Sequence, residues 1–250
     1  VLVAALNNNK MLTVSGSVAA GGSAGVGGSG AVVVSNRLTE ACIGSSADVS
    51  ALGLHGAVQA NTGEFTVDYR EFVEEDGKVA RPNYEVTDLT GDGSDDEIDN
   101  KSLTKERVAT QNTTEIRGVA VTAITQDHLE EAAVGGAASG SVAVTGAGAV
   151  SVITNQTNAF IGDNVKINQT NDAAHSTQEV LVAAGTDFYN LAIGGALAGS
   201  GGASVGPGAH VSVVTLDTMA SLGKASAVQS KGNVTVSAKT SEDILAIAAA

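Results

Sequence analysis

The 250-residue sequence contains no tryptophan, one cysteine, two prolines, and only three tyrosines and four phenylalanines. Because Cys42 is alone, it cannot form an internal disulfide, and a disulfide-stabilised scaffold is excluded. The 31 glycines come without abundant proline or a strict glycine period, which excludes collagen. A mean hydropathy of +0.14 argues against disorder. The shortage of large side chains therefore indicates a thin core of alanine and β-branched residues.

Basic residues are also scarce, since 13 lysines and arginines face 27 acids and leave a net charge of −14. Such a chain repels nucleic acid and anionic lipid, so we expect neither a nucleic-acid partner nor membrane insertion. Residues 11–36 and 132–162 carry no Asp, Glu, Lys or Arg, but they are rich in Gly, Ser and Thr and alternate with period two. They favour a buried wall over a membrane span.

The composition suits an extracellular or bacterial cell-surface protein. The sequence starts at Val1 with no basic leader segment. We interpret it as a mature or excised part of a longer chain.

Internal repeats organise most of the sequence. A shift of 118 places residues 28–44 on 146–162, and a shift of 179 places residues 1–44 on 180–223. Shifts of 59 and 61 relate the glycines near residue 135 to those near residue 195, so the unit is about 60 residues. Within each unit the apolar residues alternate with period two, as at Val32 and Val34, which is typical of strands.

These repeats predict an all-β parallel β-helix, a solenoid with one inserted excursion. A unit of about 60 residues would hold about three coils of roughly 20 residues, with glycine and asparagine at the corners. About ten such coils, each adding about 4.8 Å, would form a rod about 50 Å long. Pairing between coils satisfies the backbone, so the core can stay slender without aromatics.

One segment interrupts the repeats. Residues 63–117 hold 15 acids, seven bases and four of the seven aromatics, and no repeat match enters them. We therefore divide the chain into β-helix coils at 1–62, an acidic insertion at 63–117 and further coils of the same solenoid at 118–250. Function on solenoids tends to reside in such excursions.

The insertion contains a candidate calcium loop, DLTGDGSDDEID, at residues 88–99. Calcium loops place hard oxygens at alternate positions around a glycine turn, here Gly93. Two features depart from the pattern, because a threonine occupies the third position and an aspartate replaces the usual final glutamate. The competing interpretation is a solvated acidic turn. The predicted Ca²⁺ ligands are Asp88, Thr90, Asp92, the Ser94 carbonyl, Asp96 and Asp99.

Titration calorimetry tests this loop directly. If the loop converges its oxygens on one ion, addition of Ca²⁺ to the protein should release or absorb measurable heat at or below millimolar ion. If no heat is measured at millimolar Ca²⁺, the calcium site is contradicted and the interpretation as a solvated acidic turn is supported.

Other motifs indicate architecture more than chemistry. Gly25 to Gly30 satisfy G-x-G-x-x-G, but a strand-like AVVVS follows where a nucleotide site needs a helix. The four histidines share no metal-ligand spacing, and Cys42 is expected to be a small filler on an apolar strand. Acid pairs exist, but the repeat walls do not group them with aromatics as a sugar cleft would. We expect no catalytic residues and no cofactor other than possible Ca²⁺.

The repeat units resemble a known family. They are GSGAVVVSNRLTEACIG, GAGAVSVITNQTNAFIG and GPGAHVSVVTLDTMASLG, followed by GNVTVSAKT and a fresh start in DILAIAAA. They resemble the repeat region of large bacterial exoproteins of the filamentous-haemagglutinin type, especially fusobacterial leukotoxin-like proteins. The resemblance implies a right-handed parallel β-helix, export through an outer-membrane partner and an adhesin or toxin role. The acidic insertion has no counterpart in that pattern.

The leading functional hypothesis is a non-enzymatic fragment of a secreted or surface-exposed adhesin or toxin-like exoprotein. Its rod would display the insertion to an unidentified host or neighbouring-cell surface ligand. One alternative is a polysaccharide-active β-helix enzyme, a lyase or hydrolase. Another is a self-assembling filament or scaffold that associates through its unpaired coil edges.

Overall fold

A computed structural model of the chain describes residues 1–70 and 105–249. The chain divides into two compact units, Val1–Glu64 with Thr113–Ala250, and Phe65–Asn112. The described residues form strands, turns and loops, with no helix among them. Accordingly, this part of the chain has no helix long and apolar enough to cross a membrane.

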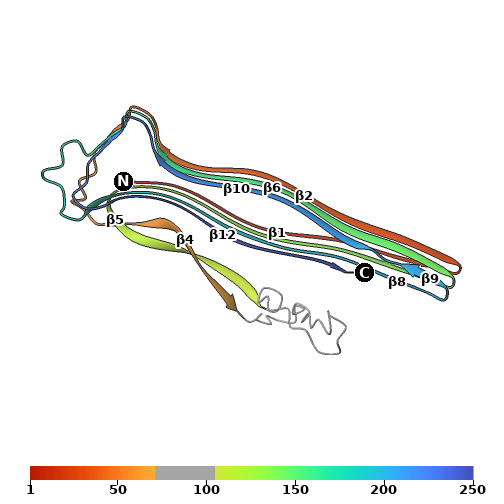
Figure 1. Ribbon diagram of the computed structural model, residues 1–250. Coiled ribbons are helices and arrows are strands. Elements are labelled where there is room, and N and C mark those ends of the chain that lie inside the picture. Colours follow the sequence, from red (N-terminus) through yellow and green to blue (C-terminus); the bar gives the residue numbers. More distant parts are fainter. Residues whose placement is uncertain (71–104, 250) are drawn as a thin grey trace, which may run out of the picture. The chain divides into compact units, whose positions relative to one another are not determined.

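The described strands form three sheets (Figure 1), and the strands along the main path of each sheet are parallel. Sheet A has the order β1-β5-β8-β12, with β4 also pairing with β5; sheet B has the order β10-β6-β2, with β9 also pairing with β6; sheet C has the order β11-β7-β3. The strands are β1 (Leu2–Gly21), β2 (Ala24–Ile43), β3 (Asp48–Val49), β4 (Val58–Arg70), β5 (Glu106–Ser139), β6 (Val142–Ile161), β7 (Lys166–Ile167), β8 (Gln178–Ser200), β9 (Ala203–Val205), β10 (Gly208–Leu222), β11 (Ala227–Val228) and β12 (Val234–Ala249).

The chain passes through the sheets in the order A, B, C and then returns to A one strand further along. Each passage pairs in register with the one before it: Leu2 lies beside Ala120, and Ala120 lies beside Leu181. The offsets between these partners equal two of the shifts found in the sequence, so those shifts are the actual pairing registers. Figure 1 shows β2, β6 and β10 running side by side, and likewise β1, β8, β12 and the later part of β5.

The predicted division into short coils, three to each repeat unit, is wrong. One passage through the sheets is much longer than such a coil, because β1 and β2 alone are 20 residues each. Sheet A is consequently four strands deep along its main path, not ten. Four strands at about 4.8 Å stack to only about 15 Å, whereas a strand of about 20 residues runs for about 65 Å. The long dimension of this unit lies along the strands, and the predicted length of about 50 Å along the stacking direction is also wrong.

Strict alternation of buried and exposed side chains explains why the strands are so long. In β2 the buried side chains are at odd positions, such as Ala31 and Val33, and the exposed ones at even positions, such as Val32 and Val34. Nothing breaks this period along the strand, although some glycines lie inside it. Other glycines mark the turns as expected, between sheets A and B at Gly22, Gly140 and Gly201 and after sheet B at Gly44, Gly162 and Gly223. The recurring corner between sheets B and C also has a residue with positive φ in each passage, at Ser46, Asn164 and Ala225.

Small apolar side chains fill the space between sheets A and B. The largest cluster lies toward sheet C and includes Ile43, Val121, Ile161 and Ile167. A second cluster consists only of alanines: Ala31, Ala133, Ala147, Ala149 and Ala196. The expected thin core of alanine and β-branched residues is therefore present, with Phe188 as a fully buried exception.

A chain of six threonine hydroxyls crosses the interior, alternating between sheets A and B. The side-chain oxygens of neighbours in the order Thr240, Thr218, Thr186, Thr157, Thr125 and Thr39 lie 3.0, 2.8, 2.9, 2.7 and 2.9 Å apart. Each hydroxyl can donate to the next and accept from the one before, which strengthens the individual bonds. The chain satisfies buried hydroxyls that would otherwise be costly.

Replacing the central hydroxyl tests the threonine chain. Thr157→Val keeps the β-branched shape but leaves the Thr186 donor and the Thr125 acceptor without their partner. We expect the free energy of unfolding to fall by about 1–2 kcal/mol in urea denaturation. The control Thr154→Val, at an outward-facing position of the same strand, should change it by less than about 0.5 kcal/mol. Equal effects would contradict a structural role for the chain.

Candidate functional site

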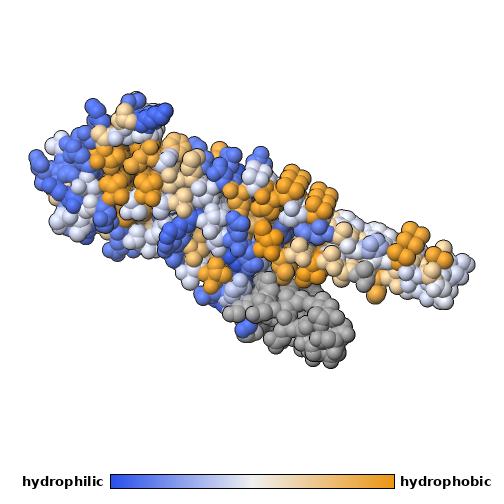
Figure 2. Space-filling model, in the orientation of Figure 1, coloured by the Kyte–Doolittle hydropathy of each residue, from blue (hydrophilic) through white to orange (hydrophobic). Residues whose placement is uncertain are grey.

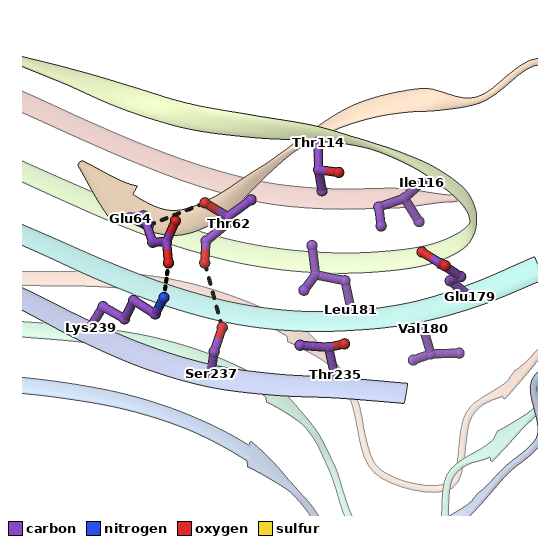
Figure 3. A pocket seen from close by; sticks show the side chains of 10 residues that line it. All are labelled: Thr62, Glu64, Thr114, Ile116, Glu179, Val180, Leu181, Thr235, Ser237 and Lys239. Atoms are coloured by element: carbon purple, nitrogen blue, oxygen red, sulfur yellow. Dashed lines mark hydrogen bonds and ion pairs between the residues drawn. The ribbon is translucent and has the colours of Figure 1, made fainter. Parts of the chain in front are cut away.

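An open groove of about 330 Å³ lies within the first unit (Figure 3). Its walls come from the start of β4, the first part of β5, and the neighbouring strands β8 and β12. The ten lining residues are Thr62, Glu64, Thr114, Ile116, Glu179, Val180, Leu181, Thr235, Ser237 and Lys239. Hydroxyl and charged groups form most of this lining, with three aliphatic side chains among them.

Two glycines allow β4 to approach β8 and so build one wall of the groove. Gly63 has a φ of 83°, and a Cβ there would lie 2.6 Å from the Ala184 carbonyl oxygen. A Cβ on Gly185 would in turn lie 2.4 Å from the Gly63 carbonyl oxygen. Both the backbone conformation and the close contact require glycine at position 63. The wall therefore depends on this glycine pair.

Polar contacts connect the wall to β12. The Lys239 ammonium pairs with the Glu64 carboxylate, and the Ser237 hydroxyl donates to the Thr62 carbonyl oxygen at 3.4 Å. The side chains of Lys239 and Glu64 are 47% and 46% exposed. A pair so exposed adds little to stability. Its charges remain accessible to a ligand that lies along the groove.

Figure 3 shows how the other lining groups are arranged. Leu181 lies in the middle of the groove. Glu64 lies toward one end, and Glu179 lies toward the other end together with Ile116 and Val180. The lining includes no histidine, cysteine or aromatic residue. With its hydroxyl, charged and aliphatic groups, the groove can hydrogen-bond and pack against an extended polar ligand.

A buried ion pair occupies the interior. Arg37 of β2 pairs with Asp127 of β5, and the Asn155 amide also donates to Asp127. The Asp127 side chain is fully buried. Burial raises the pKa of its carboxyl above the ordinary value, while Arg37 and the hydrogen bonds from Asn9 and Asn155 act in the opposite direction. This cluster joins sheets A and B and offers no open surface to a substrate.

A second interior group combines a carboxylate, a hydroxyl and an imidazole. The Ser151 hydroxyl donates to Glu131, and its oxygen lies 3.4 Å from His210 Nε2. Glu131 is 2% exposed and Ser151 is 0% exposed. These residue types occur in hydrolases, but here the serine lies between the other two and is enclosed by the sheets. The geometry suits structural hydrogen bonding, not attack on a substrate.

The residues predicted from the sequence have different outcomes. Asp88, Thr90, Asp92, Ser94, Asp96 and Asp99 lie outside the described residues, so the calcium loop stays a prediction. In the described part of the chain, no three His, Cys, Asp or Glu side chains converge as metal ligands. Cys42 is exposed on β2 beside Phe160, and the G-x-G-x-x-G glycines lie within the same strand.

The histidines are dispersed, as their spacing indicated. His128 Nε2 lies 2.7 Å from Glu130 Oε1, and its ring packs at 4.5 Å from the Tyr189 ring. His175 contacts Thr177, whereas His210 belongs to the interior group. Sequence reasoning missed the groove because its walls come from four strands far apart in the chain. Only Gly63, at the point where the repeat stops, was a local signal.

Comparison with known proteins gives no relative: no family model, no curated protein and no solved structure matches the chain.

Protonation of His210 should couple stability to pH. Burial lowers the pKa of His210 below its ordinary value of 6.5, and the Glu131 carboxylate opposes the shift. Below pH 6.5 the unfolded chain takes up a proton that the folded chain resists, so the free energy of unfolding should fall as the pH decreases from that value toward the lower pKa of the folded state.

Urea denaturation at neutral and mildly acidic pH measures this effect. The variant His210→Gln should lose part of the acid-side decrease. The control His55→Gln, in an exposed segment, should keep it. An unchanged decrease in His210→Gln would show that burial of this ring does not contribute.

Proposed function

We propose that the chain is a non-enzymatic segment of a secreted or surface-exposed bacterial adhesin or toxin-like exoprotein. Its successive passages would be coils of a right-handed parallel β-helix that supports outward-facing contact surfaces. The in-register parallel pairing of sheets A, B and C supports this interpretation. The family resemblance of the repeat units supports the placement outside the cell.

One observation supports the non-enzymatic part of the proposal: the carboxylates and the serine that come together between sheets A and B are buried. Asp127, Glu131 and Ser151 are 0–2% exposed and bonded across the two sheets. The outward surfaces of the first unit present mainly valine, leucine and hydroxyl side chains. A substrate on the surface of the first unit would therefore not reach these three groups.

The groove lined by Thr62 and Lys239 supplies one contact surface. Its hydroxyls, its accessible charges and the aliphatic Leu181 fit an extended polar ligand such as a peptide or a sugar chain on another cell. The acidic insertion supplies the second surface, and calcium bound by residues 88–99 would rigidify it. The enzyme alternative would instead need two carboxyls flanking a sugar, whereas Glu64 is already paired with Lys239.

Adhesion of the purified chain to cultured epithelial cells tests this proposal. Fluorescently labelled protein should bind in a saturable manner. Binding should fall severalfold in a variant in which residues 65–112 are replaced by a short Gly-Ser linker between Glu64 and Thr113. It should also fall in Lys239→Glu, because two carboxylates would then meet at the groove. Circular dichroism checks that each variant keeps its strands.

The control Lys224→Glu makes the same charge change at a site outside the groove lining. It should bind as the original chain does. Undiminished adhesion by both test variants would contradict the proposal. Depolymerisation of a polysaccharide panel by the original chain would favour the enzyme alternative.

A further inference from the structure

The outward face of sheet B carries rows of exposed valines. Register places Val26, Val144 and Val205 in one row, Val32, Val150 and Val211 in a second, and Val34, Val152 and Val213 in a third. The rows are 39–74%, 38–69% and 38–73% exposed. The second and third rows are adjacent outward positions and together form what we call the valine ridge. Figure 2 shows apolar side chains gathered in bands on the displayed face of the molecule.

Small residues separate the ridge from the first valine row. Gly28, Gly30, Gly146 and Gly148 occupy two outward rows, continued on the third strand by Pro207 and Ala209. We call these two rows the glycine trough. Trough and ridge have equal width, about 13 Å for two outward positions along a strand.

The fold itself does not require the trough glycines. A Cβ on any of the four would meet its nearest heavy atom at 3.7–4.0 Å, which is ordinary contact, and none has a positive φ. By contrast, a Cβ on the inward-facing Gly25 would lie 2.7 Å from the Ala138 carbonyl oxygen. Glycine weakens a strand interior and often marks close approach by another molecule. The trough therefore has room for side chains from outside the chain.

This face is also free of charge. Residues 24–36, 142–154 and 203–215 include no Asp, Glu, Lys or Arg, although the chain as a whole carries −14. A strongly charged partner would find no opposite charge here. A second copy could make contact through this face without bringing acidic side chains of the face together.

We propose that a second copy of this chain docks face to face on sheet B, each valine ridge filling the glycine trough of the other. A two-fold axis that passes between the rows of Gly30 and Val32 places the Gly30 row of one copy opposite the Val32 row of the other. The same axis places Val34 opposite Gly28, so a single operation satisfies both ridges and both troughs. This docking does not rest on the proposed function, because it involves neither the groove nor the insertion.

The spacing of the rows favours a copy over other apolar partners. Strands in both copies repeat at about 4.8 Å, so each valine row meets a row of the same period, as in paired sheets. A lipid surface has no such period, and the exposed backbone of the edge strands β2 and β10 would be unsatisfied in it. The face from Val26 to Val34 covers about 14 by 30 Å, or about 400 Å² per copy, which predicts a weak, concentration-dependent dimer.

Sedimentation equilibrium over a concentration series tests the docking. The average mass should rise from 24.7 kDa toward twice that value, and more readily at higher salt, because salt screens the repulsion between acidic chains. Gly146→Val with Gly148→Val fills the trough without an internal clash and should weaken association at least about tenfold. Val150→Thr with Val152→Thr keeps the ridge shape but makes it polar, and should weaken association too.

The trough variant separates specific docking from general stickiness. It makes the face more apolar, so non-specific association would increase where ridge-in-trough docking decreases. The control Gly195→Val, on the outward face of sheet A with nothing within 4 Å of its Cβ, should associate as the original chain does. A chain that stays at 24.7 kDa throughout, or a trough variant that associates as strongly as the original, would overturn the proposal. So would flotation of a monomeric chain with phosphatidylcholine vesicles.

Discussion

Backbone pairing between successive passages is the constraint on which the rest of the structure depends. Each long strand finds its N–H and C=O partners on neighbouring strands, and β8 pairs with β5 in register over its whole length. Side chains one passage apart are then held about 4.8 Å apart, one above another. Threonines can pass a hydrogen bond from sheet to sheet, alanines can close a thin core, and valines can line up outside. Large aromatic side chains are not needed for the backbone to be satisfied.

The same constraint governs the polar interior. A buried charge is costly unless it is paired and hydrogen-bonded, and Asp127 has Arg37 and Asn155 within the sheets. Glu131 accepts a hydrogen bond from the Ser151 hydroxyl on one oxygen, while its buried Oε2 has no hydrogen-bond partner. These groups join sheets A and B at defined positions along the strands, so they oppose a slip of one sheet along the other. Such a slip would separate Asp127 from Arg37 and Asn155.

Sequence analysis predicted the parallel pairing because identical residues stack. The shift that aligned Val32 with Val150 is the physical register of β2 and β6. The coil length could not be predicted in the same way, because alternation shows that a segment is a strand but not where it ends. Gly28 and Gly30 suggested a corner, yet they lie in the interior of β2. The groove was not predictable, since residues as distant as Thr62 and Ser237 become neighbours only after the sheets form.

Glycine shows why composition alone cannot separate folding from recognition. Gly25 and Gly63 are required from within, because a Cβ at either position would collide with a neighbouring carbonyl oxygen. Gly28 and Gly146 meet no such obstacle and still lack side chains. In a stack of in-register strands, a glycine that recurs in successive passages removes a side chain from neighbouring strands of the same row, as Gly28 and Gly146 do, so a local choice becomes a trough. Repetition along the chain thereby turns a weak preference at single positions into a surface large enough to bind.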